Sequence, residues 1–300
     1  MKRKFLLALC ICILSIPAFA KNALVVIAHG SPMAEWNAPV LALEGLITKE
    51  LQQQHLTQFD YVRVALMEYV EPNIATVVAD CERENIDSIF AVPAFIAPSS
   101  HTELDIPVLL GHKWNAYTAG ELAEEGAKLV RSRIPIIEGP TMCFSNVLED
   151  IVTARIQELS TDPANETVVL LGHGDELYEG YWHAIAEAIE KNVREKLGIT
   201  SMSHAFIEMG QTFAEDMTPV VEAAAKQRKR VLIQGIYLNS NAASMATMWG
   251  FMPTSDSIAT AHQAKIVWGP DGLLPKGSER VARWAVEQAV NMWDFERHHP

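Results

Sequence analysis

Short runs of apolar, β-branched residues alternate along this chain with longer stretches in which apolar residues recur every third or fourth position. The short runs are typical of buried strands, and the longer stretches are typical of helices with one apolar face. In the first half the expected strands are residues 23–28, 61–67, 88–96 and 134–137, and the expected helices are residues 39–54, 73–83, 118–132 and 146–159. This alternation predicts an α/β fold with a parallel sheet covered by helices on both faces.

The same order of patterns begins again about 140 residues later, as in a duplicated unit. Gly172-His173-Gly174 follows the apolar run 168–171, as Ala28-His29-Gly30 follows 24–27. Three further segments, 205–208, 231–238 and 268–270, match 65–68, 89–96 and 138–140 in the same order. We therefore expect two pseudo-symmetric α/β lobes, residues 21–160 and 161–300, with a cleft between them. The first half is longer, and its extra residues are expected within residues 109–126.

The first twenty residues have the three regions of a secretory signal peptide. Residues 2–4 are basic, residues 5–17 are apolar, and Ala18-Phe19-Ala20 is a cleavage site of small residues. The apolar run is short for the alternative, a membrane anchor. We expect cleavage after Ala20 and a periplasmic or secreted protein. In that oxidising compartment Cys81 and Cys143 are able to pair, but their spacing does not decide whether they do.

Composition narrows the possible functions only a little. The chain has 300 residues, of which 49% are hydrophobic and 20% charged, and this excludes a disordered chain or a fibre. The formal net charge of −13 argues against general nucleic-acid binding. No stretch after the signal peptide is apolar for long enough to span a bilayer, so we expect no stable membrane insertion of the mature chain.

Polar side chains follow three expected strands of the first half. His29 ends the first strand, Glu68 ends the second, and His101 follows the third. Because ligands bind at the carboxyl ends of the strands in an open parallel sheet, we expect these side chains to face one rim. Two imidazoles and a carboxylate suit a divalent transition metal ion and suit proton transfer equally well. A lone histidine at such a place is more often a hydrogen-bonded rim residue, but three matching positions favour a functional site.

The second half keeps only part of this set. His173 and Glu208 stand at equivalent strand ends, but Ala243 takes the position that matches His101. Two ligands without a second imidazole make a poor metal site, so the metal is expected in the first half. His183 is interpreted as an ordinary amphipathic helix residue. The chain lacks a dinucleotide-binding glycine pattern, a Walker lysine motif and the Gly-x-Ser-x-Gly motif of many hydrolases, although an unrelated metal-dependent hydrolase remains a third alternative.

Three segments of the first half resemble the sirohydrochlorin cobaltochelatase (CbiX) type of class II chelatase. They are residues 26–31 (VIAHGS), 65–72 (ALMEYVEP) and 93–107 (PAFIAPSSHTELDIP). The resemblance implies two similar α/β lobes with a tetrapyrrole in the cleft, and insertion of Co²⁺, or in relatives Fe²⁺ or Ni²⁺, without ATP or another nucleotide. It also implies that His29 and His101 bind the metal and that Glu68 belongs to an acidic motif.

The sequence departs from the family in its signal peptide, in its extra residues and in Pro98-Ser99-Ser100, where the family has a glycine-containing turn. The signal peptide leaves the physiological macrocycle open, because tetrapyrrole synthesis is cytosolic. Arg63, Lys113 and Arg131 are candidates to bind an acidic macrocycle. We expect a periplasmic chelatase with catalytic residues His29, Glu68 and His101. The alternative is a non-catalytic periplasmic protein that binds a metal ion or a tetrapyrrole for transport or storage.

Overall fold

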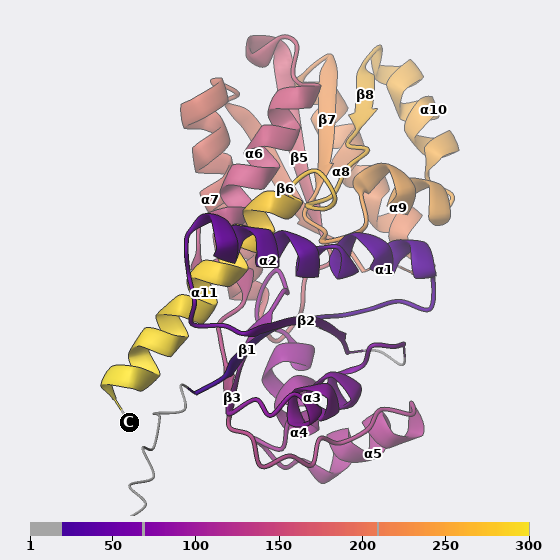
Figure 1. The fold of residues 1–300 in the computed structure, drawn as a ribbon. Coiled ribbons are helices and arrows are strands. Elements are labelled where there is room, and N and C mark those ends of the chain that lie inside the picture. The colour runs from indigo at the N-terminus through magenta and orange to yellow at the C-terminus, as the bar shows by residue number, and fades with distance from the viewer. Residues whose placement is uncertain (1–19, 68–69, 209, 300) are drawn as a thin grey trace, which may run out of the picture.

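Two four-stranded parallel sheets form the centres of two lobes (Figure 1). The computed structural model describes residues 20–67, 70–208 and 210–299, so Glu68 and nearly all of the predicted signal peptide lie outside the described residues. The first sheet has the order β2-β1-β3-β4, with strands Tyr61–Leu66, Asn22–Ala28, Ser88–Pro93 and Ile136–Glu138. The second has the order β6-β5-β7-β8, with strands Ser201–Phe206, Glu166–Gly172, Arg230–Gly235 and Lys265–Trp268. This repeated order confirms the predicted duplicated α/β fold.

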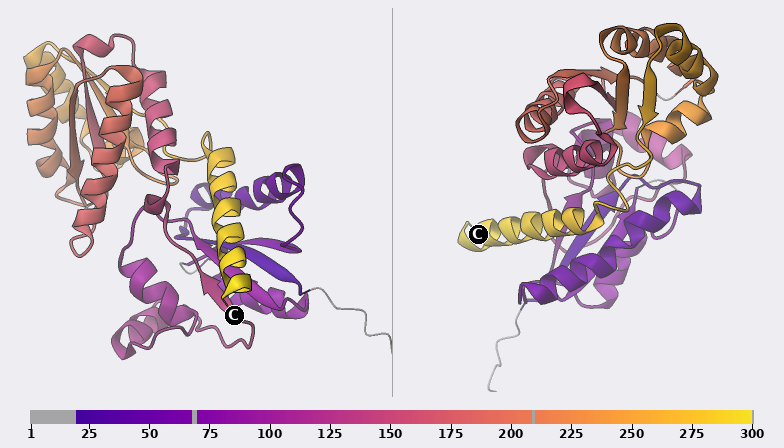
Figure 2. Two further views of the ribbon diagram at one scale, coloured as in Figure 1. Left: turned by 90° about the vertical axis from the view of Figure 1, so that its left-hand side faces the viewer. Right: turned by 90° about the horizontal axis from the view of Figure 1, so that it is seen from above.

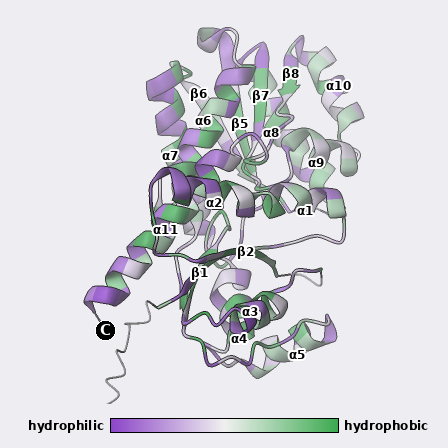
Figure 3. Cartoon of the chain, in the orientation of Figure 1, coloured by the Kyte–Doolittle hydropathy of each residue, from purple (hydrophilic) through white to green (hydrophobic). Residues whose placement is uncertain are grey.

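Helices cover both faces of each sheet, which explains why the central strands are mostly apolar. All seven residues of β1 are buried; Leu24 and Val26 pack in the core on one face, and Val25 and Ile27 pack in the core on the other. Figure 3 shows the resulting pattern, with hydrophobic strands and hydrophilic outer helix surfaces. Burial on both faces is the expected state of strands in a parallel sheet.

One layer of helices covers the outer face of each sheet. On the first lobe this layer contains α3 (Ile74–Arg83), α4 (Ile106–Leu109) and α5 (Ala116–Glu124). On the second lobe it contains α8 (Phe213–Gln227), α9 (Ala242–Met248) and α10 (Met252–His262). Helix α3 begins where its sequence pattern predicted, because the Asn73 side chain accepts a hydrogen bond from the backbone N–H of Thr76 and caps the helix.

The inner layer joins the two lobes because each lobe receives one helix from the other half of the chain. Helix α6 (Val147–Leu159) precedes β5, yet it packs on α7 (Glu179–Leu197) and β7 of the second lobe. Helix α11 (Ser278–His298) returns to the first lobe and packs on α2 (Leu43–Gln53), β1 and β3 (Figure 2). The division at residues 160 and 161 falls between α6 and β5, and two separate domains with those limits stay a prediction.

Three sequence-based boundaries were wrong. The helix expected over residues 39–54 is two helices, α1 (Ala34–Leu41) and α2. The helix expected over 118–132 ends at Glu124, shortly before Gly126, whose φ of +87° is left-handed and favours glycine. The extra length of the first half lies mainly in residues 125–135, which join α5 to β4, whereas residues 263 and 264 alone join α10 to β8.

Two further properties concern the environment of the chain. None of the helices in the described part of the chain is long and apolar enough to cross a membrane. Cys81 and Cys143 are free thiols in the structure, with Cys81 a buried residue of α3 and Cys143 half-buried.

Candidate functional site

The carboxyl ends of the central strands of both sheets open onto one cleft between the lobes. The cleft has a volume of about 600 Å³. The first lobe contributes His29 after β1 and Phe95 and His101 after β3, and the second contributes His173 after β5 and Tyr237 after β7. The position agrees with the rule that ligands bind at the carboxyl ends of parallel strands.

His29 and His101 lie side by side in this cleft because β1 and β3 are neighbours in the sheet. Their ring centroids are 5.0 Å apart and their planes make an angle of 75°. Gly30, with φ of +85°, turns the chain directly after His29. The structure thus brings two of the three predicted site residues together. Their role as metal ligands, and the whole role of Glu68, stay predictions.

Asp105 orients His101, and the sequence interpretation did not assign it this role. His101 begins a wide helical turn, His101–Asp105, so a residue four positions later lies on the same face. Nδ1 of His101 is 2.7 Å from Oδ2 of Asp105. A carboxylate at Nδ1 keeps the ring proton there and directs Nε2 to a metal ion, which is the usual outer partner of a metal-binding histidine. The His-x-x-x-Asp spacing was the available sequence signal.

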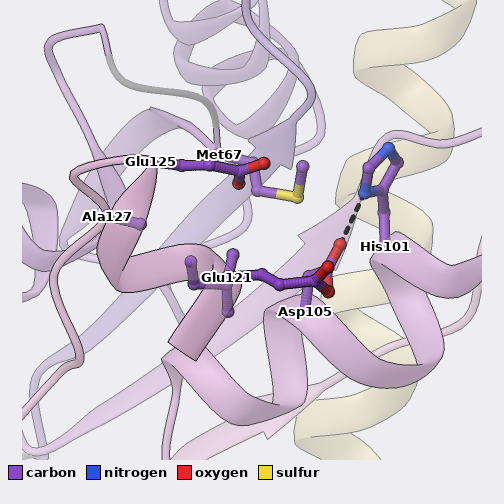
Figure 4. Close-up of a pocket in the computed structure, with 7 residues that line it drawn as sticks. Met67, His101, Asp105, Glu121, Glu125 and Ala127 are labelled. Atoms are coloured by element: carbon purple, nitrogen blue, oxygen red, sulfur yellow. Dashed lines mark hydrogen bonds and ion pairs between the residues drawn. The ribbon is translucent and has the colours of Figure 1, made fainter. Parts of the chain in front are cut away.

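A small cavity of about 110 Å³ lies behind His101 (Figure 4). It is lined by Met67, which follows β2, by Asp105 of the helical turn, by Glu121 of α5 and by Glu125, which directly follows α5. Figure 4 shows the dashed contact between His101 and Asp105 at the edge of this cavity. The three carboxylates that line this cavity create a local negative potential that favours cations over anions.

The equivalent position of the second lobe lacks a second imidazole. Nδ1 of His173 is 2.9 Å from the carbonyl oxygen of Gly174, and Ala243 lies at the start of α9. His173 and Glu208 face a wider hollow of about 780 Å³ that is also lined by Asp175, Glu176 and Glu179. Among the described residues no group of three or more His, Cys, Asp or Glu side chains is arranged to hold a metal ion. The first lobe differs from the second in that it has a pair of neighbouring imidazoles, His29 and His101.

The residues expected to bind an acidic macrocycle do not lie at the cleft. Arg63 pairs with Glu44 at 2.8 Å and lies over the ring of Tyr61, and Nζ of Lys113 donates to the backbone carbonyl of Glu103. Neither these two nor Arg131 is among the described residues that line either hollow, and no other lysine or arginine is. The polar groups of the narrower cleft are instead mainly neutral: Ser31, Ser99, Ser100, Asn239 and Ser240.

Glu138, the last residue of β4, has a raised pKa that makes the stability of the protein depend on pH. Burial, followed by the nearby Glu103 carboxylate, raises its pKa from 4.5 to about 7. The folded state therefore binds more protons than the unfolded state between these values, so the free energy of unfolding falls as pH rises from about 4.5 to 7.

Replacing Glu138 by glutamine should remove this loss and stabilise the protein at pH 8 by about 2–3 kcal/mol, at 1.36 kcal/mol for each unit of pKa difference. Chemical denaturation at pH 4.5 and pH 8 measures the effect. The exposed Glu124→Gln serves as control. An identical pH dependence for the wild type and Glu138→Gln would refute the assignment.

The first half of the chain is similar in sequence to known chelatases. The sequence model of the CbiX family matches residues 23–159. The chain is 30% identical to a sirohydrochlorin cobaltochelatase of Methanococcus maripaludis over 90 residues. This matched stretch covers 30% of this chain and 58% of that protein. The chain is also 28% identical to a sirohydrochlorin cobaltochelatase of Methanococcoides burtonii over 141 residues, a stretch that covers 46% of this chain and 97% of that protein. The chain thus spans less than two thirds of the first relative's length.

A solved structure matches almost the whole chain. It is the sirohydrochlorin chelatase SirB from Bacillus subtilis subspecies spizizenii in complex with cobalt, with a TM-score of 0.61 and 13% sequence identity. The match covers 93% of this chain and 98% of that chain. At this identity it shows the fold alone. Residues 23–159 are thus similar to the CbiX family, and the chain as a whole has the two-lobed fold of the SirB chelatase.

Proposed function

We propose that this chain is an exported class II chelatase that inserts a divalent metal ion into a sirohydrochlorin-like tetrapyrrole without ATP. The observation that carries the proposal is the imidazole pair of His29 and His101 at the wall of the cleft between the lobes. Imidazole nitrogens bind Co²⁺, Ni²⁺ and Fe²⁺, and they release the ion more readily than thiolates. The family match of residues 23–159 supports the same chemistry.

The two parts of the cleft suit the two substrates. The narrower part is lined by Trp36, Phe95, Trp182 and Tyr237, whose rings offer apolar surface to a flat macrocycle. The wider part is lined by carboxylates, which attract a cation toward the cleft, and the imidazole pair that holds the ion lines the narrower part. The metal ion is a substrate in this scheme. It leaves the imidazole pair for the macrocycle, and the two pyrrole protons that it replaces pass to a base and then to water.

Turnover separates this proposal from the non-catalytic alternative. The chain beginning at Lys21 is mixed with sirohydrochlorin and Co²⁺ at a large excess of substrate, and the absorption spectrum of the macrocycle is followed. An enzyme converts many equivalents without a nucleotide, whereas a binding protein saturates at about one equivalent. Parallel assays with Fe²⁺ and Ni²⁺ identify the preferred ion.

Export predicts a specific N-terminus. The basic, apolar and small-residue regions place cleavage after Ala20, so the exported protein should begin at Lys21. Mass spectrometry of the protein from the periplasmic fraction measures this directly. Recovery of the intact chain from Met1 in the membrane fraction alone would exclude cleavage.

Glu68 is proposed as the proton acceptor, which predicts that Glu68→Gln lowers turnover about 10²–10⁴-fold and changes Co²⁺ affinity much less. The amide keeps the size of the side chain but does not accept a proton at neutral pH. Steady-state rates and Co²⁺ titrations of the same preparation separate the two effects. Glu71→Gln is the control three positions later in the sequence, where the carboxylate accepts a hydrogen bond from the backbone N–H of Asn73. Unchanged turnover of Glu68→Gln between pH 6 and 9, roughly the range where His and a perturbed Glu titrate, would defeat this role.

A further inference from the structure

A second pair of imidazoles lies in the other lobe, outside the proposed catalytic site. His183 is on α7, and His204 is on β6, the edge strand of the second sheet. Their ring centroids are 5.1 Å apart and their planes make an angle of 65°. The corresponding values for His29 and His101 are 5.0 Å and 75°. The second pair therefore has nearly the same ring arrangement as the pair proposed to hold the substrate ion.

Each ring of this second pair has a carboxylate at its outer nitrogen. Nε2 of His183 is 3.3 Å from Oε1 of Glu179, and Nδ1 of His204 is 2.8 Å from Oε1 of Glu190. The inner nitrogens, Nδ1 of His183 and Nε2 of His204, are 2.9 Å apart. Metal-binding histidines commonly donate their second ring N–H to a carboxylate. Both rings have this partner in place, and both inner nitrogens face one point.

His204 is a polar residue on a face of β6 whose neighbouring side chains are apolar. It pairs in register with Leu170, and Met202 and Phe206 on either side of it pack against the apolar core under α7. A polar ring on an apolar face is costly unless its nitrogens have partners. Glu179 and Phe206 also line the wider hollow of the cleft. The pair therefore lies next to two residues of that hollow, and it is reachable from solvent through His183, whose side chain is 45% exposed.

The inner nitrogens of the two rings are available to a metal ion when the ring protons lie on the outer nitrogens. A neutral imidazole carries one proton, and a proton at the outer nitrogen leaves the inner nitrogen with a lone pair. The carboxylates of Glu179 and Glu190 lie at the outer nitrogens, so both outer N–H groups keep their partners when an ion binds. The two inner nitrogens, which are 2.9 Å apart, therefore offer a divalent ion two lone pairs.

We infer that His183 and His204 form a second binding site for a divalent transition metal ion, with Glu179 and Glu190 orienting the two rings. Two nitrogens at about 2.0–2.1 Å from a tetrahedral ion lie about 3.3 Å apart, so the 2.9 Å contact opens by about 0.4 Å on binding. Water molecules complete the coordination, because the described residues contain no third convergent ligand. Two imidazoles with oxygen ligands favour Co²⁺, Ni²⁺, Cu²⁺ or Zn²⁺ over Mg²⁺ and Ca²⁺.

Calorimetric titration with CoCl₂ tests the site, and a background that lacks the first pair makes the test independent of the proposed enzyme activity. The wild type is expected to bind two ions, and His29→Ala/His101→Ala one. Adding His183→Gln/His204→Gln to that background should weaken the remaining binding more than 100-fold. Glu190→Gln, which keeps both imidazoles, should weaken it about 10–100-fold. Circular dichroism and thermal unfolding verify that each variant is folded.

His298→Gln/His299→Gln is the matched control, because it removes the adjacent histidines at the exposed end of α11. It should leave the stoichiometry at two. The inference is overturned if the His29→Ala/His101→Ala protein binds no Co²⁺, or if its remaining binding survives loss of His183 and His204. In the first case only the second site is refuted. A wild type that binds one Co²⁺ and inserts it into many equivalents of sirohydrochlorin still satisfies the proposed function.

Discussion

His101→Ala and His29→Ala should each abolish measurable chelation, whereas His173→Ala should retain most of it. The two imidazoles of the first lobe lie 5.0 Å apart, so loss of either leaves a single monodentate ligand for the ion. Loss of an outer-shell partner alone commonly weakens a metal site 10–100-fold, so loss of a direct ligand should exceed that range. His173 contacts the carbonyl of Gly174 just as His29 contacts that of Gly30, but it has Ala243 where a second imidazole would be needed.

Turnover and Co²⁺ titration measure this prediction, and titration in the His183→Gln/His204→Gln background counts the first site alone. Circular dichroism verifies the fold of each variant. If His173→Ala abolished binding while His101→Ala did not, the active half would have been assigned wrongly. The site would then have to be rebuilt around His173 and Glu208 of the second lobe.

Asp105→Asn should weaken Co²⁺ binding about 10–100-fold although Asp105 does not itself touch the ion. The carboxylate at 2.7 Å keeps the proton of His101 on Nδ1. An asparagine amide is able to donate to Nδ1 instead, which moves the ring proton to Nε2 and blocks the metal-binding nitrogen. Nitrogen chemical shifts of His101 report the tautomer, and Co²⁺ titration reports the affinity.

Glu103→Gln is the control for Asp105, because it changes a carboxylate of the same helical turn that does not contact the His101 ring. It should leave both the tautomer and the affinity unchanged. Equal affinity of Asp105→Asn and the wild type would show that the carboxylate has no part in orienting the metal ligand.

Local sequence patterns were enough to predict the duplicated α/β fold and the common rim of His29 and His101. Strands buried on both faces are continuous apolar runs, and a parallel sheet places all its carboxyl ends at one edge. Because β1 and β3 are neighbours, the two histidines that follow them meet. Periodicity alone does not state that these strands are adjacent.

The exchange of α6 and α11 was not predictable, because an apolar helix face has the same period whichever sheet it covers. Ile151 of α6 and Trp284 of α11 are both buried, and nothing in their local sequence identifies the lobe that receives them. The metal-like arrangement of His183 and His204 was missed for a related reason. The segment that matched the first half began only at residue 205, so the position of His204 between Met202 and Phe206 on β6 was not considered, and His183 resembled an ordinary helix residue.

Anomalous diffraction at the cobalt edge, from crystals of the chain soaked in CoCl₂, tests most directly whether the first lobe holds the substrate ion. The account predicts a peak between the rings of His29 and His101, about 2 Å from a nitrogen of each. A peak beside His173 and Glu208, with none between His29 and His101, would contradict it.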